Sequence, residues 1–594
     1  MRGVSPPENA GLPDLLRHWA RHGGDRPLYR HLVNGEDREE VLTAGEFLRQ
    51  VNLLSDDLRA RYEPGTRLLL MFPTGLEFLV AFCSALCAGM IAVPIPAVGP
   101  NRFARAVPRL LGIVQDCRPG AILTTPALSV MRAVAAETSW ELAVPDWRSV
   151  VLDPADPRTP SDHFAHSAAE DIAFLQYTSG STAAPKGVIV TFDNLRNNQR
   201  AIGDLISRTD RPTQSVAGWL PHYHDMGLAE KIFGLFHGVP TTFFSPAHFV
   251  QKPVRWLDML SRYKASTTCA PNFALEVCAK RIPEVRRGDI DLSALNYLIL
   301  GAEPIAASTL DRFAATFRDC GFRSSSYLPS FGMAETTVLA TGASLREPVV
   351  KSICKEVKIG SLVYPPPNGN TDTRRVVSCG PPPEGHSVEI VEPESKEILA
   401  EGFVGEIWYR GPSVGAGYWQ SEPSAVSGFN GTLADGRSGY LRTGDLGLLI
   451  DQELFIVGRI KDVIITRGRN IFPQDIEHYV AASIDGVSAH GVVAIGSAPE
   501  EAESEAVVIL VEAHRTLCST HDNYRLHEIA MEIHKEIQSE FEITVQEVVL
   551  VGPNRLPKTS SGKLRRMACH QQWKEELFPR LADSLLQDQG EVRV

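Results

Sequence analysis

The feature that most constrains the fold is a regular alternation of short apolar runs and amphipathic stretches between Thr66 and Gly342. The runs have the length of buried strands, and the stretches carry apolar residues at helical spacing. Runs include TRLLLMFP, GAILTTP, IAFLQYT, VAGWLP, TTFFSP, STTCAP and LNYLILGA, and stretches include PVRWLDMLSRYKA and AASTLDRFAATF. Strand and helix in repetition predict an α/β region with a parallel sheet covered by helices. Because ligands of such sheets bind at the carboxyl ends of strands, the loops after these runs are the expected site.

One uncharged stretch, Phe78 to Gly99, is long enough to span a bilayer. It is interrupted by Gly89, Pro94 and Pro96, which favours a helix followed by a strand. We therefore expect a buried helix over 77–88, with Gly89 just after its end, and a strand over 90–95. This interpretation predicts no transmembrane segment.

The second half of the chain changes character. Residues 343–385 are rich in Pro, Gly and polar residues, which is typical of an inserted surface segment. Short apolar runs separated by glycines over 388–457 predict an antiparallel β region. A boundary is expected near 458–462, and the remainder is predicted to form a compact unit. One of its helices has a stripe of apolar residues on one face, Leu526, Ile529, Ile533, Ile537 and Phe541.

Composition excludes several classes of protein. The 594 residues carry a formal charge of −12, which argues against general nucleic-acid binding because that needs a basic surface. The ten cysteines contain no CxxC pair, so neither a zinc ribbon nor a thioredoxin-type site is expected. The first residues lack an apolar signal region. These observations favour a cytoplasmic protein with reduced thiols, and a monomer is the default expectation.

The strongest chemical signal is YTSGSTAAPKG, residues 177–187, which follows the strand-like run IAFLQ. It differs from the GxxxxGK[ST] phosphate loop. It still combines small residues, whose backbone N–H groups approach an anion, with hydroxyl donors and a lysine. Taken alone, its alternative interpretation is an ordinary Ser/Thr/Gly-rich connection.

This segment and six others resemble, in order, motifs of the adenylate-forming superfamily, which includes acyl-CoA synthetases, peptide-synthetase adenylation domains and luciferases. The others are GAEP (301–304), FGMAETT (331–337), VGEIWYRGPSVGAGYW (404–419), YLRTGDLG (440–447), GRIKD (458–462) and PKTSSGKLRR (557–566). The segments WLPHYHDMGL (219–228), APNFALEVC (270–278) and GRNIFPQDIE (468–477) are most similar to the fatty acyl-AMP ligase branch. Residues 343–379 lie where that branch carries an insertion thought to restrain the movement needed for CoA thioesterification.

The resemblance implies a fold of two parts. Residues 1–459 are expected to form a large N-terminal adenylation domain of the α/β class, with parallel sheets flanked by helices and a β subdomain. Residues 460–594 are expected to form a small, mobile α+β C-terminal domain that carries the catalytic lysine. The hinge between them matches Lys461.

The resemblance also assigns site residues. The catalytic lysine matches Lys563, the magnesium-associated carboxylate matches Glu335, and His224 matches a position close to the acyl carboxylate. A hard cation held by one carboxylate and phosphate oxygens is normal magnesium chemistry. Asp445 matches the acceptor of the ribose hydroxyls, and Arg459 matches a second ribose or phosphate contact. Further nucleotide-binding positions are Thr178, Ser179, Gly180, Ser181, Thr182, Lys186, Gly301, Ala302, Glu303, Pro304, Ser330, Phe331, Gly332, Met333 and Ala334.

Each of these residues also has an ordinary structural interpretation. Asp445 suits a turn, Lys563 suits an exposed surface and Glu335 suits a helix start. Three positions depart from the family pattern and bear on nucleotide affinity. These are Ala183 and Phe331, where Gly and Tyr are usual, and Leu300, where the branch often has Asn.

The expected reaction joins a fatty acid to AMP from ATP, with Mg²⁺, and releases pyrophosphate. The acyl group then passes to the pantetheine thiol of a holo acyl carrier protein supplied in trans, because no pantetheine-attachment motif follows Arg566. The cluster Lys558, Lys563, Arg565, Arg566 and Lys574 suits either an acidic carrier or plain solvation. The apolar wall of the acyl pocket is expected around 219–228 and 271–274. Two alternatives stay open: an acyl-CoA synthetase of the same fold, and a non-catalytic nucleotide- or acyl-binding module.

Overall fold

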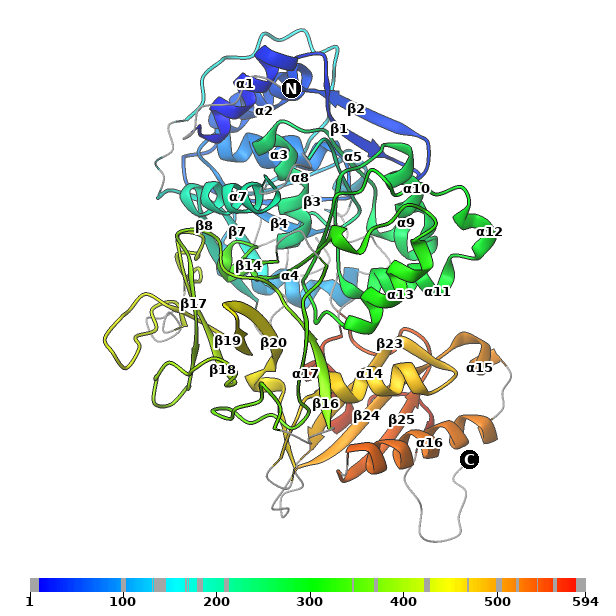
Figure 1. Cartoon of the computed structure of the whole chain (residues 1–594). Helices are drawn as coiled ribbons and strands as arrows, with labels where there is room; N and C mark the ends of the chain where they lie inside the picture. Colours follow the sequence, from blue (N-terminus) through cyan, green and yellow to red (C-terminus); the bar gives the residue numbers. More distant parts are fainter. Residues whose placement is uncertain are drawn as a thin grey trace.

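The computed structural model describes residues 10–97, 103–130, 132, 146–165, 168, 170–178, 185–207, 213–343, 347–367, 372–420, 428–466, 469–497, 505–519, 523–541, 543–558 and 564–583. Figure 1 shows a large upper part, from blue to yellow-green, with the orange and red C-terminal part packed beneath it.

Two mostly parallel sheets form the centre of the upper part. The first has the order β14(Thr341–Gly342), β13(Tyr327–Phe331), β12(Tyr297–Leu300), β11(Thr267–Ala270), β9(Val216–Gly218), β10(Thr241–Phe243), β1(Pro27–Leu32), β2(Glu39–Thr43). Only its edge strands β14 and β2 pair antiparallel. The second has the order β6(Trp147–Ser149), β5(Ala121–Thr124), β3(Arg67–Phe72), β4(Ile91–Pro96), β7(Ile172–Thr178), β8(Lys186–Thr191), with β8 antiparallel to β7. The predicted parallel α/β region is confirmed, although as two sheets.

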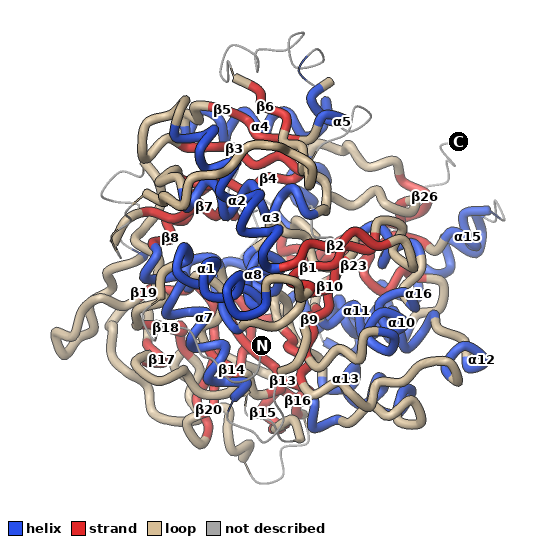
Figure 2. The backbone as a smooth tube through the Cα atoms, turned by 90° about the horizontal axis from the view of Figure 1, so that it is seen from above, coloured by secondary structure: helices blue, strands red, loops and turns tan. Residues whose placement is uncertain are grey.

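Helices α3(Leu76–Cys87) and α8(Asp225–His237) lie between the two sheets (Figure 2). Both pack into one core cluster with strand residues from each sheet, such as Tyr29 and Phe174. A helix covered on two sides must be apolar around its whole circumference, and α3 is buried at nearly every position. The apolar stretch that resembled a membrane span is therefore a central helix followed by β4. Gly89, at φ +76°, adopts the left-handed conformation expected just after the helix end.

The other helices of the upper part cover the outer faces and edges of the sheets (Figures 1 and 2). They are α1(Leu12–Gly23), α2(Ala44–Arg59), α4(Phe103–Cys117), α5(Pro126–Ser129), α7(Phe192–Ser207), α9(Pro246–Gln251), α10(Val254–Arg262), α11(Asn272–Arg281), α12(Glu284–Arg287) and α13(Ala307–Phe317). Within the described ranges, no helix combines the length and the hydropathy needed to cross a membrane.

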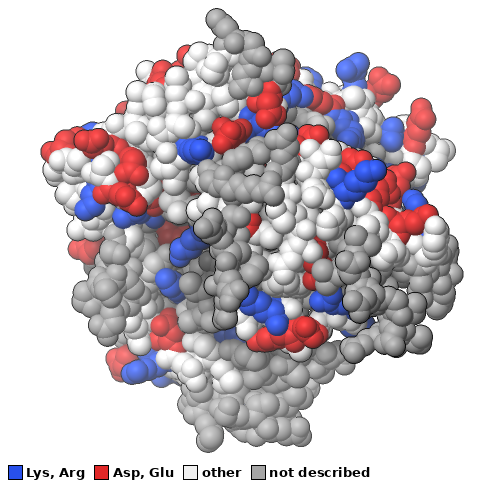
Figure 3. All heavy atoms as spheres, turned by 90° about the horizontal axis from the view of Figure 1, so that it is seen from below, with Lys and Arg blue, Asp and Glu red and all other residues white. Residues whose placement is uncertain are grey.

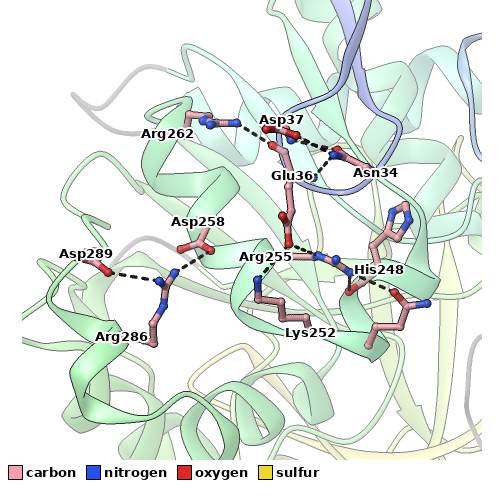
Figure 4. A network of polar contacts seen from close by, with 11 residues as sticks. Asn34, Glu36, Asp37, His248, Lys252, Arg255, Asp258, Arg262, Arg286 and Asp289 are labelled. Carbon is pink, nitrogen blue, oxygen red and sulfur yellow. Dashed lines mark hydrogen bonds and ion pairs between the residues drawn. The ribbon is translucent and has the colours of Figure 1, made fainter.

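A network of polar contacts ties the β1–β2 turn to α9 and α10 (Figure 4). Asn34 Oδ1 accepts hydrogen bonds from the backbone N–H groups of residues 36–38, which orders the turn. Glu36 then accepts from Lys252 Nζ at 3.1 Å and from Arg255 Nε at 3.0 Å. These contacts join the first strands of the chain to helices more than 200 residues later.

The predicted antiparallel region is confirmed as a four-stranded sheet, β17(Ser387–Val391), β18(Gly405–Arg410), β19(Leu441–Ile450) and β20(Glu453–Arg459). The preceding insertion forms a hairpin, β15(Val350–Cys354) and β16(Thr373–Val377). The prediction of a surface segment is wrong for part of this hairpin and its loop. Ile353, Val357 and Val363 are buried in one cluster with Phe455 and with Phe472 of the C-terminal part.

The C-terminal part contains a mixed sheet, β23(Val487–Ser497), β24(Ala506–Ala513), β25(Val545–Val551) and β26(Arg580–Asp583). Helices α14(Pro473–Ser483) and α16(Asn523–Phe541) pack on one face, and α17(Arg566–Lys574) packs on the other. The small hairpin β21(Ile464–Thr466) and β22(Arg469–Ile471) precedes them, and α15(Arg515–Ser519) follows β24. All five residues of the predicted stripe on α16 are buried in the core, so that prediction is confirmed.

Candidate active site

A single cavity of about 790 Å³ contains most of the predicted site residues that the structure describes. Its walls include the ends of β4, β7 and β13 and the loop after β12. It is also lined by Arg459, by Lys461 and by the start of α17, so residues of the C-terminal part close one side. The cavity therefore lies at the carboxyl ends of parallel strands, where the site is expected.

Glu335 lies in a short 3₁₀ turn, η3(Ala334–Thr336), that directly follows β13. Its Oε1 accepts a hydrogen bond from Tyr418 Oη at 2.7 Å. Burial raises the pKa of Glu335, and the Tyr418 hydroxyl partly opposes this shift. Lys186 Nζ lies 5.0 Å from the centre of the same tyrosine ring. A carboxylate and a lysine thus flank Tyr418 at the cavity wall. Tyr418 belongs to the motif at residues 404–419, but its sequence alone assigned it no role.

The residues at this wall fit a magnesium ion bound together with phosphate. Among the described residues, no group of three or more His, Cys, Asp or Glu side chains is arranged to hold a metal ion. A cation beside Glu335 therefore needs oxygen ligands from a substrate, which is the usual arrangement for Mg²⁺ with a nucleotide. The buried carboxyl, whose pKa is raised, would be stabilised in its charged form by such an ion.

The residues predicted to form the adenine pocket lie in the turn after β12 and at the end of β13. Gly301 and Ala302 line the cavity, and Ala302 has φ +68°, an uncommon conformation for a residue with a side chain. Ser330 Oγ donates to the Leu300 carbonyl at 2.8 Å and ties the two segments together. A Cβ at Gly332 would lie 1.6 Å from the Val338 carbonyl oxygen, so only glycine fits there. The cavity is also lined here by Ser330, Phe331, Gly332, Met333 and Ala334.

Two residues of the predicted adenine pocket are absent from the described cavity lining, Glu303 and Pro304. The Glu303 carboxylate accepts the backbone N–H of Phe273 at 2.6 Å, near the start of α11. In the structure, Glu303 therefore caps a helix that packs beside the site. Its role in nucleotide binding, like that of Pro304, stays a prediction.

Asp445 and Arg459 face each other across β19 and β20 as directly paired residues. Arg459 Nε lies 2.6 Å from Asp445 Oδ1. The Asp445 side chain is only 6% exposed, whereas that of Arg459 is 58% exposed and lines the cavity. A second cation–carboxylate pair, Arg442 with the buried Glu406, lines the same wall at 2.8 Å. Sequence reasoning missed this second pair because nothing in a single arginine or glutamate distinguishes it from surface charge.

His224 is the residue immediately before α8, and its side chain lines the cavity. Its Nδ1 lies 3.0 Å from Asp225 Oδ1, and the same oxygen accepts the Met226 backbone N–H at 2.6 Å. The helix start therefore orients the imidazole. His222, two residues earlier, is buried against the Phe78 ring, and burial lowers its pKa to about 3. That residue is a neutral core histidine, in contrast to the cavity-lining His224.

A mainly apolar part of the cavity lining includes the α8 residues that follow His224, and we call this part the acyl lobe. It is lined from α7, α8, β9, β11, β12 and the segment after β13, by Ile202, Leu205, Ile206, Val216, Met226, Ala229, Glu230, Phe233, Thr267, Cys269, Ile299, Val338 and Leu339. The predicted wall at 219–228 is partly correct, because Tyr223 to Met226 line the cavity. Residues 271–274 are absent from the described lining, and Ala274 packs in the neighbouring core, so that part of the wall stays a prediction.

Five predicted residues lie outside the described residues: Ser179, Gly180, Ser181, Thr182 and Lys563. Their described neighbours Thr178, Lys186 and Leu564 all line the cavity. Lys461, the predicted hinge, lies in the 3₁₀ turn η5(Ile460–Asp462) and also lines the cavity.

The comparisons with known proteins agree with this geometry. Residues 16–419 match the AMP-binding enzyme family, and residues 461–582 match the AMP domain of the Disco-interacting protein 2-like type. The chain is 36% identical to the medium-chain-fatty-acid–[acyl-carrier-protein] ligase JamA of Moorena producens, over 100% of this chain and 98% of that protein.

Solved structures of fatty acyl-adenylate ligases are also similar to this chain. One, from a study of fatty acyl-adenylate ligases of E. coli and L. pneumophila, has a TM-score of 0.82 at 29% identity and covers 96% of this chain and 99% of that one. A fatty acyl-adenylate ligase from L. pneumophila in complex with acyl adenylate and pyrophosphate has a TM-score of 0.71 at 30% identity, with 96% and 97% covered. The chain therefore belongs to the AMP-binding enzyme family, the adenylate-forming ligases. Within that class it is a fatty acid–AMP ligase.

Proposed function

We propose that this enzyme condenses a fatty acid with ATP to form acyl-AMP and pyrophosphate. The acyl group then passes to the phosphopantetheine thiol of a carrier protein in trans, forming a thioester and releasing AMP. The observation that carries the proposal is the lining of the cavity. Predicted nucleotide-binding residues and an apolar lobe line one continuous space, and His224 lines it as well. Such a space suits a molecule that is a nucleotide at one end and a fatty chain at the other.

In the first step, a carboxylate oxygen attacks the α-phosphorus of ATP, and the bond from that phosphorus to the pyrophosphate oxygen breaks. The protein mainly positions the reactants and balances charge. We assign the phosphates to the 178–186 loop, the ribose hydroxyls to Asp445, and the fatty carboxylate to the space beside His224. Lys563 would stabilise the charge that develops around the α-phosphate. Glu335 would hold Mg²⁺, which when bound neutralises phosphate charge.

The second step is proposed to follow a rotation of residues 460–594 against residues 1–459 about Lys461. The insertion, residues 343–379, contacts the C-terminal part and would oppose that rotation. Arg374 Nη1 lies 2.8 Å from Asp475 Oδ2, and its guanidinium packs over the Phe472 ring. Lys355 Nζ lies 2.8 Å from Glu540 Oε1, and it packs over the Phe541 ring. We name these two sets of contacts the hairpin clasp.

Two residues of the basic cluster considered for carrier docking are already engaged in ion pairs, so the cluster offers less free positive charge than the sequence suggests. Lys558 is paired with the buried Glu512 at 2.6 Å. Arg566 is paired with both Asp462 and Glu477 at 2.7 and 2.6 Å. The described lower face shows acidic and basic side chains interspersed (Figure 3). Of the four described members, only Arg565 and Lys574 are exposed, so the carrier surface is proposed to include other residues.

A product assay by mass spectrometry tests the proposal. Purified protein would be mixed with ATP, Mg²⁺ and a series of fatty acids, either without acceptor, with CoA, or with a holo carrier protein. We expect acyl-AMP that persists with CoA and is consumed by the carrier. Efficient acyl-CoA formation would reassign the enzyme to the CoA synthetases. Absence of any adenylate would support a binding module. Gel filtration of the same sample would test the proposed monomer.

A further inference from the structure

Two arginines that line the cavity, Arg109 and Arg565, differ from the others beside them because they have no ion pair. The other three arginines of the described lining each pair with a carboxylate: Arg442 with Glu406, Arg459 with Asp445, and Arg566 with Asp462. Within the described part of the chain, the guanidinium groups of Arg109 and Arg565 make neither an ion pair nor a hydrogen bond. Arginine stays protonated in proteins, so both positions carry positive charge that no described carboxylate balances.

Arg109 lies on the face of α4 that packs against the segment predicted to bind phosphates. Asp116 accepts a hydrogen bond from the hydroxyl of Tyr177, at the start of that segment. One turn earlier on the helix, a Cβ at Gly112 would lie 2.9 Å from Pro185 Cδ, so α4 closely contacts the other end of the segment. Arg109 is three residues before Gly112, about 4.5 Å along the helix axis. Its side chain therefore lines the cavity beside the position assigned to the phosphates of ATP.

Arg565 lines the same cavity from the C-terminal part. It immediately precedes α17, and its backbone N–H donates to the Pro557 carbonyl at 2.9 Å. The next residue, Arg566, is held by its ion pairs with Asp462 and Glu477. The backbone at Arg565 is thus fixed from both sides, while its exposed side chain has no described partner.

The two guanidinium groups act on each other electrostatically. Burial and then the positive charge of Arg565 lower the pKa of Arg109, and Tyr223 partly opposes this shift. Like charges in a partly buried site repel, so the site is unfavourable without a ligand. An anion between the two groups would replace this repulsion with attraction to both. Guanidinium groups bind phosphate oxygens through paired hydrogen bonds, which makes a phosphate group the best match.

We propose that Arg109 and Arg565 together bind the pyrophosphate end of ATP. This inference rests on the proposed function, because it takes the cavity to be the ATP site. Arg109 belongs to the upper part of the chain and Arg565 to the C-terminal part, so the β- and γ-phosphates bridge the two parts until pyrophosphate leaves. The fatty carboxylate is the other anion of the reaction, and it is assigned to the space beside His224. The test distinguishes these two anions.

Calorimetric titrations with ATP and with AMP test this inference, in Mg²⁺ and without a fatty acid, so that no acyl-AMP forms. The ratio of the two Kd values reports contacts to the pyrophosphate end. We expect Arg109→Met and Arg565→Met each to weaken ATP binding by about 10-fold or more, as for loss of a hydrogen bond between charged groups. AMP binding should weaken much less. Arg109→Lys keeps the charge without the paired hydrogen bonds, and should recover part of the ATP affinity.

Matched controls remove an arginine outside the described cavity lining. Arg118 follows the last residue of α4, Arg555 lies in the C-terminal part, and both are exposed. Arg118→Met and Arg555→Met should leave the ratio of Kd values unchanged, whereas an effect of net charge alone would appear in them as well. Thermal unfolding of each variant would confirm that it is folded. Arg565→Met, at an exposed position, provides the test if Arg109→Met is not folded.

Steady-state pyrophosphate release separates the two anions. We expect Arg109→Met to raise the KM for ATP far more than the KM for the fatty acid. A rise confined to the fatty acid would assign Arg109 to the carboxylate and overturn the inference.

The binding outcomes also separate this inference from the proposed function. An unchanged ratio of Kd values in both methionine variants would overturn the inference and leave the ligase function standing. Equal weakening of ATP and AMP would overturn it too, because the contacts would not be specific to the pyrophosphate end. A loss with only one variant would refute the role of the other arginine. Wild-type protein that binds neither nucleotide would refute the proposed function as well.

Discussion

At the scale of the residue, the site is a set of ordinary side chains placed in unusual surroundings. Asp445 is buried beside Arg459, Glu335 accepts a hydrogen bond from Tyr418, and His224 is oriented by Asp225. Each arrangement holds a polar group ready for a ligand, because its neighbours already fix its direction. The proposed chemistry depends on this preorganisation more than on any reactive nucleophile, since the substrate carboxylate itself performs the attack.

Replacing Lys563 tests the assignment of the catalytic lysine. We expect Lys563→Ala to lower the rate of acyl-AMP formation by about 10²-fold or more, as for loss of one transition-state donor. Single-turnover pyrophosphate release would measure it. Lys574→Ala, an exposed lysine on the neighbouring α17, serves as the control and should remain near wild type. A near-normal rate for Lys563→Ala would refute the assignment.

The raised pKa of Glu335 leads to a prediction about how stability depends on pH. Burial raises its pKa in the folded, ligand-free protein, so the unfolded chain releases this proton at lower pH than the folded protein does. Its contribution to stability is therefore full below the unfolded pKa and is lost as pH rises through the folded pKa. Glu335→Gln removes that loss. We expect the variant to exceed wild type in Tm at about pH 8 and to differ less at about pH 4.5.

The same variant should lose adenylation activity, because the carboxylate is proposed to hold the metal. Thermal unfolding without nucleotide and a pyrophosphate-release assay would be run on one preparation. A Tm difference that is larger at acidic pH than at alkaline pH would contradict the pKa argument. Full activity would contradict the metal assignment.

At the scale of the element, the insertion hairpin differs most from what its sequence predicts. A segment rich in proline and glycine buries Ile353 and Val357 in a core that it shares with the β17–β20 sheet and the C-terminal part. Its strand β16 then points two adjacent arginines toward different partners. Arg374 contacts Asp475 of α14, whereas Arg375 contacts Asp311 of α13 at 2.8 Å.

These adjacent arginines provide a matched pair of variants. Arg374→Ala removes a clasp contact worth about 1 kcal/mol, which shifts an equilibrium between orientations roughly five-fold. We expect it to increase acyl-CoA formation from acyl-AMP and CoA by a similar factor. Arg375→Ala removes a contact within the upper part and should not. Acyl-CoA formation that is equal in the two variants would contradict a restraining role for the clasp.

At the scale of the whole molecule, the two parts of the chain meet around one cavity. The upper part contributes the strand ends and α8, while the C-terminal part contributes Lys461 and the residues that follow Lys563. A ligand that fills the cavity therefore contacts both parts at once. Its binding should couple their stabilities, because unfolding of either part removes contacts to the ligand.

A non-hydrolysable acyl-adenylate analogue tests this coupling. At 100 times its Kd, a ligand of the folded state alone adds about 2.7 kcal/mol to the free energy of unfolding. We expect the analogue to raise the Tm and to merge any separate transitions of the two parts into one. Adenosine, which reaches only the nucleotide region, should have a smaller effect in the same calorimetric scan. Equal shifts with both ligands would argue against a shared cavity.

The sequence alone determined the class of fold and most of the site, because both depend on local patterns. The run IAFLQYT and the apolar stripe on α16 are periodic over a few residues, and local sterics and burial decide such elements. Motif order likewise predicted Glu335, Asp445 and Arg459; Glu335 and Arg459 line one cavity, and Asp445 is paired with Arg459.

Only the tertiary structure decided which side chains meet across long stretches of chain. The Glu230 carboxyl packs against Gly218 because α8 packs between two sheets, and no pattern around residue 230 encodes this contact. The same holds for Arg374 and Asp475, which are 101 residues apart, and for Glu303, whose carboxylate caps α11. Such pairings depend on packing of the whole chain, whereas hydrophobic periodicity reports only the face that each element buries.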